Sequence, residues 1–333
     1  MSYPAQTEES AHPHLPGFPL LPVTVVGSYP IAPTPKELMR SYYTKEDPFI
    51  TAIKQSVREQ AETGVHIISD GQTRANMVNI FASKLAGVRM KGKPQVFSEI
   101  QYTGPITIAD QQYVLNVIED IDSPPRQPTQ QTSPLLKGDI TGPHTMSQSV
   151  TDIYYNDEKE LSFAFAQALN QEARALQEIV PILQIDEPFF SVSYVDYAGE
   201  LIAEILDGIT IPVSLHVCGD ITPIFEDLIE MPVTILDHEF TANPHLLKLV
   251  QRYDFDQMFG FGVVRSNHNK VEPVDWIEKR IRAAVDAFGV ERVMVDPDCG
   301  LKHLTRDVAR RKLENMREAR DRVLKDSGLG EIS

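Results

Sequence analysis

Hydrophobic and β-branched residues recur along the chain in short runs, separated by longer amphipathic stretches. Eight of the runs have the length and composition of strands: Thr24–Gly27, His66–Asp70, Leu136–Ile140, Ile182–Asp186, Val213–Val217, Val233–Asp237, Met258–Val264 and Val293–Asp296. Four stretches between or after them carry apolar residues at helical spacing: Asp47–Thr63, Glu158–Glu178, Val274–Phe288 and Thr305–Leu324. Strands that alternate with helices in this way predict a parallel sheet covered by helices.

The number of strand-like runs favours a closed α/β barrel. Eight parallel strands, most of them followed by a helix, make a (β/α)8 barrel, and we expect a single barrel over residues 21–330. A doubly wound open sheet is the alternative, because short apolar runs can also be helix segments. The length of 333 residues fits either one large barrel or two ordinary domains.

Two regions depart from this alternation. Residues 1–20 are rich in Pro, His, Glu and Ser without periodicity, which predicts a loosely ordered N-terminal arm. The segment Lys91–Arg126 reads as extended, hairpin-like strands with a Gly-Pro turn, so we expect an insertion at about 91–134. The Pro-rich sequence SPPRQPTQQTSP at its end predicts a mobile surface loop.

Composition excludes several classes of function. A hydrophobic fraction of 42% with 23% charged residues predicts a substantial buried core. The formal net charge of −16 argues against binding to nucleic acid, which requires clustered Lys and Arg. No apolar run approaches the roughly 18 residues of a membrane span, and the N-terminus lacks the features of a secretion signal. We therefore expect a cytoplasmic protein without a nucleic-acid or membrane partner.

Four residues at predicted strand ends are candidate metal ligands. His216 and Cys218 lie two apart in SLHVCGD, so both project to one side of their strand. Cys299 follows another strand in VDPDCG, and Glu239 follows VTILDHE. These four residues would lie together at the C-terminal rim of a barrel. Thiolate, imidazole and carboxylate are common zinc ligands, and a catalytic zinc keeps one exchangeable position, so this set predicts a catalytic zinc site.

The two cysteines also admit a simpler interpretation. Cys218 and Cys299 are the only cysteines, which argues against a disulfide-stapled scaffold, and such a pair can be buried small apolar residues. The H-x-C spacing alone is a weak signal, and position at strand ends is what favours metal binding. His238 precedes Glu239 and faces the opposite way if the strand continues, so only one of the two can join the site.

Further polar residues at the predicted rim are candidates for ligand binding. QIDEPFF places Asp186 and Glu187 at a strand end, where a charged group serves a ligand or caps a helix. VVGSYP offers Gly27 and Ser28 in a turn that a carboxylate can approach closely, although an ordinary βα turn is equally consistent. DGQTR carries Gln72 at the second rim position, with a solvated loop as the alternative.

The loop after the seventh strand carries one histidine of interest. His268 lies in FGFGVVRSNHNK, and histidine exchanges protons near neutral pH, although a lone loop histidine is more often simply exposed. The single tryptophan, Trp276, lies in VDWIEKRI, where packing on a helix face is the expected role.

In combination, these motifs resemble the catalytic domain of the cobalamin-independent methionine synthase family. VVGSYP, the D-G segment ending in NMV, ITGP, QIDEP, H-V-C, the later Glu, FGVV and DPDCGLK follow one another in the order of that family, from about residue 22 to the last helix. The resemblance implies a barrel of the type shared with uroporphyrinogen decarboxylase. It also implies zinc-dependent methyl transfer to homocysteine, which gives methionine.

Residue roles follow from the resemblance position by position. It implies four zinc ligands: His216, Cys218, Glu239 and Cys299. It implies that Ser28 and Asp186 hold the amino acid, and Gly27 and Gln72 are further candidates for substrate binding. It gives Asp186 and His268 catalytic roles, with His268 as the proton donor, although the family histidine aligns one position earlier.

The methyl donor is indicated by what the chain lacks. Long members of the family carry an additional N-terminal barrel, whereas this chain looks like the short, core-type synthases of archaea and some anaerobic bacteria. Such core enzymes are thought to take the methyl group from a methylated corrinoid, often on a protein. No tryptophan follows ITGP, where the long enzymes have a pterin-contacting one. The resemblance therefore implies methylcobalamin or a corrinoid protein as donor, with a methyl-tetrahydropterin as the alternative.

Gln72 departs from the family pattern D-G-E, in which the Glu carboxylate would face the substrate ammonium. A neutral amide accepts a hydrogen bond but supplies no charge, so another thiol such as coenzyme M is an alternative acceptor. The retained Asp186 favours homocysteine. The non-catalytic alternative is a structural zinc or corrinoid-binding protein, although structural zinc sites usually have four Cys or His ligands close in sequence.

Overall fold

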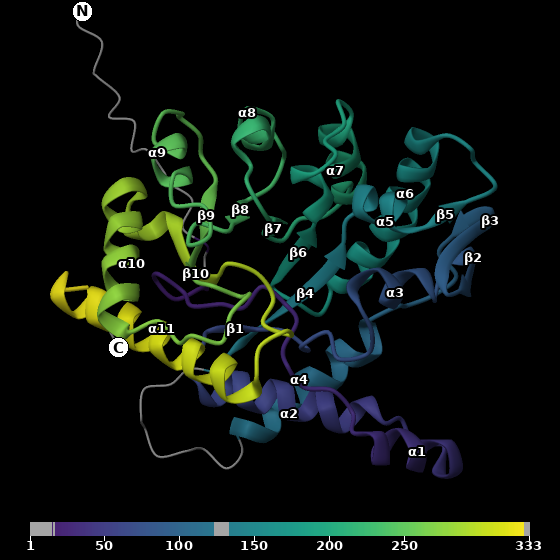
Figure 1. Cartoon of the computed structure of the whole chain (residues 1–333), viewed down its shortest axis with the longest axis horizontal. Coiled ribbons are helices and arrows are strands. Elements are labelled where there is room, and N and C mark those ends of the chain that lie inside the picture. The colour runs from purple at the N-terminus through teal and green to yellow at the C-terminus, as the bar shows by residue number, and fades with distance from the viewer. Residues whose placement is uncertain (1–14, 16, 123–132, 330–333) are drawn as a thin grey trace, which may run out of the picture.

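The computed structural model describes residue 15, residues 17–122 and residues 133–329. Seven strands form one curled sheet in the order β1-β4-β6-β7-β8-β9-β10, and each neighbouring pair is parallel (Figure 1). They are β1 (Ile67–Ile68), β4 (Leu135–Thr141), β6 (Ile182–Asp186), β7 (Val213–Val217), β8 (Ile235–His238), β9 (Met258–Val264) and β10 (Val293–Pro297). Each matches one of the predicted runs to within two residues at either end.

The remaining predicted run, Thr24–Gly27, closes the sheet into a barrel. Val23 pairs with Val295 of β10, and Thr24 pairs with Ile67 of β1, both in parallel. The backbone N–H of Thr24 donates to the Val295 carbonyl at 2.9 Å. Regular pairing here is limited to these bridges, but they join the first and last strands of the sheet. The predicted (β/α)8 barrel is confirmed, and the open doubly wound sheet is wrong.

Helices surround the strands (Figure 1). They are α1 (Pro35–Thr44), α2 (Phe49–Glu62), α3 (Met77–Ala82), α4 (Ile108–Asp122), α5 (Pro143–Ser149), α6 (Glu158–Leu176), α7 (Ala198–Leu206), α8 (Phe225–Ile229), α9 (Leu246–Val250), α10 (Val274–Phe288) and α11 (Arg306–Asp326). Short 3₁₀ helices cover Pro188–Ser191, Thr222–Ile224 and Val290–Arg292. The four helical stretches predicted from apolar spacing correspond to α2, α6, α10 and α11, each to within two residues.

Alternation along the strands divides the barrel interior into an apolar and a polar half. One apolar cluster, separate from the main core, consists of residues near the strand starts together with one residue from the N-terminal segment: Ile67, Ile182, Ile235, Met258, Met294 and Leu15. Farther along the strands, the positions on the same side are buried but polar: Lys137, Asp139, Gln184, Asp186, Ser214, His216, Asp237 and Asp296. The chemistry of the barrel is therefore concentrated toward its C-terminal rim, as in other barrels of this kind.

The predicted hairpin exists, but it begins earlier than expected. Strands β2 (Ala86–Lys91) and β3 (Lys93–Gln101) pair antiparallel, and β5 (Thr151–Asp152) adds to β3 in parallel. The turn lies at Gly92, whose φ of 71° favours glycine, and not at the Gly-Pro sequence farther on. The prediction of a Gly-Pro hairpin turn is wrong.

The second half of that segment is helical, so the prediction of extended strands up to Arg126 is also wrong. Helix α4 occupies residues 108–122, and its buried apolar residues Val114, Val117 and Ile118 recur every three or four positions. That spacing puts them on one helix face, whereas a strand would separate them onto two faces. The many β-branched residues obscured this periodicity, and contact of α4 with α2 and β4 stabilises the helix.

Two predictions fall mostly outside the described residues. They are the loosely ordered arm at residues 1–20, except for residue 15 and residues 17–20, and the mobile loop at 123–134, except for its last two residues. Leu15 is buried at the start of the barrel, where it contacts the apolar interior cluster. Within the part of the chain that the structure describes, no helix is long and apolar enough to cross a membrane.

Candidate active site and metal centre

Three of the candidate ligands meet at the C-terminal rim of the barrel. His216 lies on β7, Cys218 follows β7, and Cys299 follows β10. The imidazole Nε2 of His216 is 3.1 Å from Cys218 Sγ, which is 3.2 Å from Cys299 Sγ. All three ligand atoms lie within 4.8 Å of one another. Two sulfurs and one imidazole nitrogen so arranged match the ligands that zinc prefers.

The imidazole of His216 is oriented by a buried carboxylate on the neighbouring strand. His216 Nδ1 lies 3.2 Å from Asp237 Oδ1, and both side chains are only 2% exposed. This contact directs Nε2 toward the two sulfurs. A carboxylate behind the far nitrogen is the usual arrangement for a metal-binding histidine, because it fixes the tautomer and the ring plane. Sequence reasoning missed Asp237, although it stands two positions before Glu239 on the same strand face.

Electrostatics in this group favour a thiolate on Cys299. A hydrogen bond from Cys218 lowers the pKa of the Cys299 thiol well below its usual value, and the same contact raises the pKa of Cys218. Burial lowers the pKa of His216, but its interactions with Cys218 and Asp237 outweigh burial and raise that pKa well above its usual value. A thiolate on Cys299 and the carboxylate of Asp237 are buried charges that a bound cation would offset.

Glu239 lies beside the three-residue group but is not part of it. Burial raises the pKa of its carboxyl, the charge of Cys299 raises it further, and a hydrogen bond from the Gly219 backbone lowers it. Its neighbour His238 is fully buried on the other face of the sheet, with Nδ1 3.3 Å from the Val217 carbonyl. Only Glu239 of this pair therefore faces the site, as strand alternation requires.

Asp186 lies beside the three-residue group, at the end of the strand next to β7. It is paired with His216 in the register of β6 and β7, and it accepts a hydrogen bond of 2.7 Å from the Gln184 amide. Burial raises the pKa of Asp186, and the charge of His216 opposes that effect. The carboxylate is 6% exposed and so lies close to the candidate metal group in a nearly dry environment.

The carboxylate of Glu187, next to Asp186, binds the start of helix α5. Its carboxylate accepts hydrogen bonds from the backbone N–H groups of His144 and Thr145, at 2.9 and 2.8 Å, and from the Thr145 hydroxyl at 2.7 Å. These donors belong to the first turn of α5, so Glu187 satisfies a helix N-terminus. Gly142 is required here, because a Cβ at that position would lie 2.2 Å from the Glu187 carboxyl carbon.

The turn after the first strand brings Gly27 and Ser28 to the same rim. A Cβ on Gly27 would lie 2.7 Å from Asp139 Oδ2 and 2.9 Å from Gln72 Nε2, so only glycine leaves room for both side chains. Ser28 lies against Gly300, which follows Cys299, and the Ser28 carbonyl accepts a hydrogen bond of 2.8 Å from the Leu301 N–H. The candidates for substrate binding, Gly27 and Ser28, thus adjoin the segment that carries the candidate metal ligand Cys299, although they are far from it in sequence.

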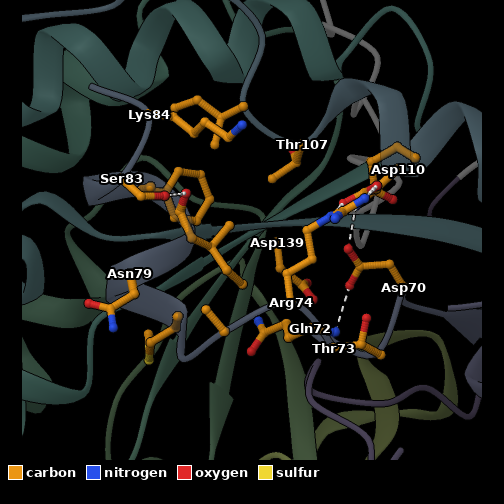
Figure 2. A pocket seen from close by; sticks show the side chains of 16 residues that line it. Asp70, Gln72, Thr73, Arg74, Asn79, Ser83, Lys84, Thr107, Asp110 and Asp139 are labelled. Carbon is orange, nitrogen blue, oxygen red and sulfur yellow. Dashed lines mark hydrogen bonds and ion pairs between the residues drawn. The ribbon is translucent and has the colours of Figure 1, made fainter. Parts of the chain in front are cut away.

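A cavity of about 140 Å³ opens beside Gln72, and Figure 2 shows its polar lining. The Asp70 carboxylate accepts a hydrogen bond of 2.7 Å from the Gln72 N–H, and burial raises the pKa of Asp70 to about 6. Arg74 is engaged by two carboxylates, Asp47 at 2.7 Å and Asp110. Asp139 also lines the cavity, and sequence reasoning missed it, although it follows Lys137 by two positions on one strand face.

His268 and Trp276 are not members of the three-residue group. The His268 side chain is 42% exposed; its Nδ1 accepts a hydrogen bond of 3.3 Å from the Lys270 N–H, and its Nε2 is 3.9 Å from Glu272 Oε1. Trp276 is partly exposed on α10, where the Arg280 guanidinium lies 5.0 Å from its ring centroid. The catalytic role of His268 stays a prediction.

Comparison with known proteins identifies the family. Residues 21–322 match the family model described as the catalytic domain of cobalamin-independent synthase. The methionine synthase of Methanocaldococcus jannaschii is 35% identical over 313 residues, which cover 89% of this chain and 97% of that protein. The chain belongs to the cobalamin-independent methionine synthase family. The family resemblance expected from the motifs is thereby confirmed.

Other members of the family agree in sequence and in fold. The methionine synthase of Methanothermobacter thermautotrophicus is 37% identical over 306 residues, covering 88% of this chain and 97% of that protein. Among solved structures, a B12-independent methionine synthase from Shewanella sp. W3-18-1 superposes with a TM-score of 0.76 at 22% identity, over 93% of this chain and 99% of that one. The barrel is therefore the fold of the methionine synthase family.

Proposed function

We propose that this chain transfers a methyl group to the sulfur of homocysteine and so forms methionine, with zinc at the rim of the barrel. The observation that carries the proposal is the convergence of His216, Cys218 and Cys299, whose ligand atoms lie within 4.8 Å of one another. Membership of the methionine synthase family supports the reaction, and the donor set supports the metal.

The residues present fit zinc. His216, Cys218 and Cys299 would hold the ion, with Glu239 beside them as a fourth, displaceable ligand whose position the substrate thiol can take. The chemistry that zinc supplies when bound is a lowered pKa for a coordinated thiol, which keeps the thiol as the nucleophilic thiolate at neutral pH. A ligand set of three that is drawn from two strand ends of a barrel rim, with Cys299 lying 81 positions after Cys218, favours a catalytic over a structural zinc.

The residues around the metal group would bind and orient the amino acid. Gly27 and Ser28 offer backbone and hydroxyl groups for the substrate carboxylate, in a turn that lies against Gly300. Asp186 offers a buried carboxylate for the ammonium, next to His216 in the sheet register. Gln72 lines the adjoining cavity. Holding the thiol in line with the methyl group in this way reduces the entropic cost of reaction.

A proton-exchange role for His268 is part of the proposal and has its own test. The side chain lies on an exposed loop after β9, so substrate or partner binding would have to bring it to the reacting groups. Substitution His268→Gln removes the titrating group while leaving a polar side chain. If His268 exchanges the proton, kcat falls and its pH dependence changes, while the melting temperature stays the same.

For the methyl donor, we propose methylcobalamin or a methylated corrinoid protein. The support is the absence of tryptophan after ITGP and the position of the sole tryptophan, Trp276, on the outer helix α10. A methyl-tetrahydropterin is the competing donor, and membership of a family described as cobalamin-independent favours it. Coenzyme M is the competing acceptor, because Gln72 lacks the charge that an ammonium requires.

The deciding experiment uses purified protein of verified zinc content. Methyl transfer to homocysteine and, separately, to coenzyme M is measured with methylcobalamin and with a methyl-tetrahydropterin. We expect methionine from homocysteine, and loss to background after chelation with recovery when zinc is restored. Cys299→Ser should lose both zinc and activity while the fold is retained. Normal turnover in Cys299→Ser would contradict the proposal, and unfolding on chelation would favour a structural zinc.

A further inference from the structure

Asp139 is a buried carboxylate that accepts no hydrogen bond within the part of the chain that the structure describes. It lies on β4 and is 8% exposed, and neither of its oxygens has a hydrogen-bond partner among the described residues. The polar group that faces it is the neutral amide of Gln72, across the space that Gly27 leaves open. A buried, unsatisfied carboxylate is destabilising, so we expect a ligand to satisfy it.

The buried or half-buried cations near Asp139 are engaged elsewhere, and Lys84, which also lines the cavity, is exposed to solvent. Lys137, two positions earlier on the strand, donates to the Val25 carbonyl and to the Gln184 side chain. Arg74, on the cavity wall, is bound by Asp47 and Asp110. Lys302 donates to backbone carbonyls of the Gln72 loop. The cavity lining thus holds three carboxylates, Asp70, Asp110 and Asp139, against the two cations Arg74 and Lys84 (Figure 2).

Electrostatic coupling connects this charge to the candidate metal group through Asp186. Burial raises the pKa of Asp139 well above its usual value, and the charges of Asp186 and Asp70 add to this, whereas Lys137 and the nearby Gln72 amide lower it. The pKa of Asp186 is in turn lowered by the charge of His216 and raised by the charge of Cys299. An amino-thiol whose sulfur lies at the metal group would thus place its ammonium beside Asp186 and Asp139, where the positive charge offsets both carboxylates.

We propose that Asp139 is a specificity-determining residue that binds the ammonium of the thiol substrate and supplies the negative charge that Gln72 does not. The inference rests on the proposed function, since it takes the sulfur to lie at the metal group. It assigns the acceptor as an amino-acid thiol rather than an amine-free one. Charge-assisted hydrogen bonds in a buried site are strong, so an acceptor without the ammonium leaves Asp139 unpaired and is rejected.

The test compares homocysteine with 4-mercaptobutanoate, which has the same thiol and carboxylate but no amine. The wild-type protein should prefer homocysteine by at least about 10²-fold in kcat/KM. Asp139→Asn should reduce that preference by about tenfold or more, chiefly through the homocysteine value. Calorimetric titration with methionine gives a second readout, in which Asp139→Asn weakens binding without methyl transfer being involved.

Two further variants keep the result interpretable. Asp307→Asn, an exposed change of the same charge on α11, should leave the preference unaltered. The double variant Asp139→Asn with Gln72→Glu moves the carboxylate to the facing side chain and should restore the preference. If the wild type makes methionine but Asp139→Asn discriminates as well as wild type, the role of Asp139 is refuted. If the wild type methylates neither thiol, the proposed function itself fails.

Discussion

Removing the carboxylate behind His216 should weaken zinc binding without removing a ligand. In Asp237→Asn the group 3.2 Å from His216 Nδ1 becomes a neutral amide, which can present either N–H or oxygen to the ring. The tautomer and plane of the imidazole are then less firmly held. Loss of such a partner typically lowers metal affinity by about 10–100-fold, which corresponds to about 1.4–2.8 kcal/mol. Both side chains are 2% exposed, so solvent does not screen the contact and the full effect is expected.

The measurement is a competition for zinc between the protein and a chromophoric chelator at constant pH and ionic strength. A matched control exists in the same protein, because Asp220 lies 3.1 Å from His245 with both side chains about half exposed. Asp220→Asn makes the same chemical change at nearly the same distance, but in solvent. Since surface pairs of this kind contribute little, zinc affinity should stay close to wild type in the control.

Two results would refute the reasoning about Asp237. Wild-type zinc affinity in Asp237→Asn would mean that His216 needs no buried carboxylate to present Nε2 to the metal. An equal loss in Asp237→Asn and Asp220→Asn would mean that net charge, and not ring orientation, governs the affinity. A wild-type protein that binds no zinc at all would refute the metal centre itself.

Three predictions concern stability. Gly142→Ala should lower the free energy of unfolding in a urea titration by about 1–3 kcal/mol, because its Cβ would lie 2.2 Å from the Glu187 carboxyl carbon, whereas Gly199→Ala, with open space around it, should not lower it. Burial raises the pKa of Glu187 from 4.5 to about 7. The contribution of its protonation to the free energy of unfolding is therefore greatest below pH 4.5 and is lost as the pH rises through about 7. In Glu187→Gln the pH dependence of the urea midpoint should flatten, and an unchanged slope would contradict this. Lys312→Met should destabilise the fold by about 3–5 kcal/mol by thermal or urea melting, since it removes the ammonium that lies 2.6 Å from the buried carboxylate of Glu272.

The hydrophobic pattern was a good guide wherever burial followed a single period. Strands β6, β7 and β9 coincide with the predicted runs at both ends, because strands covered on both faces are apolar almost throughout. Helix α10 also coincides with its predicted range. The pattern failed at residues 108–122, where β-branched residues suggested strands and only the spacing of buried positions indicated α4.

Residue types and their place at strand ends were enough to nominate the chemistry of the site. His216 and Cys218 share a side because of strand alternation, which is a local property. Cys299 was nominated for its residue type and its position after a strand, and the structure places it 3.2 Å from a cysteine 81 positions earlier. That distance depends on closure of the barrel through Val23 and Thr24, which the apolar runs suggested only by their number.

The sequence by itself determined the strands, most of the outer helices, the candidate ligands and the family, since these depend on periodicity and on residue types at particular positions. Only the tertiary structure decided which buried carboxylates face which partners: Asp237 faces His216, Glu187 holds the start of α5, and Asp139 faces the amide of Gln72. The physical reason is that partner choice depends on strand register and barrel closure, which bring together residues far apart in the chain. A local pattern tells on which side of a strand a charge lies, but not what stands opposite it.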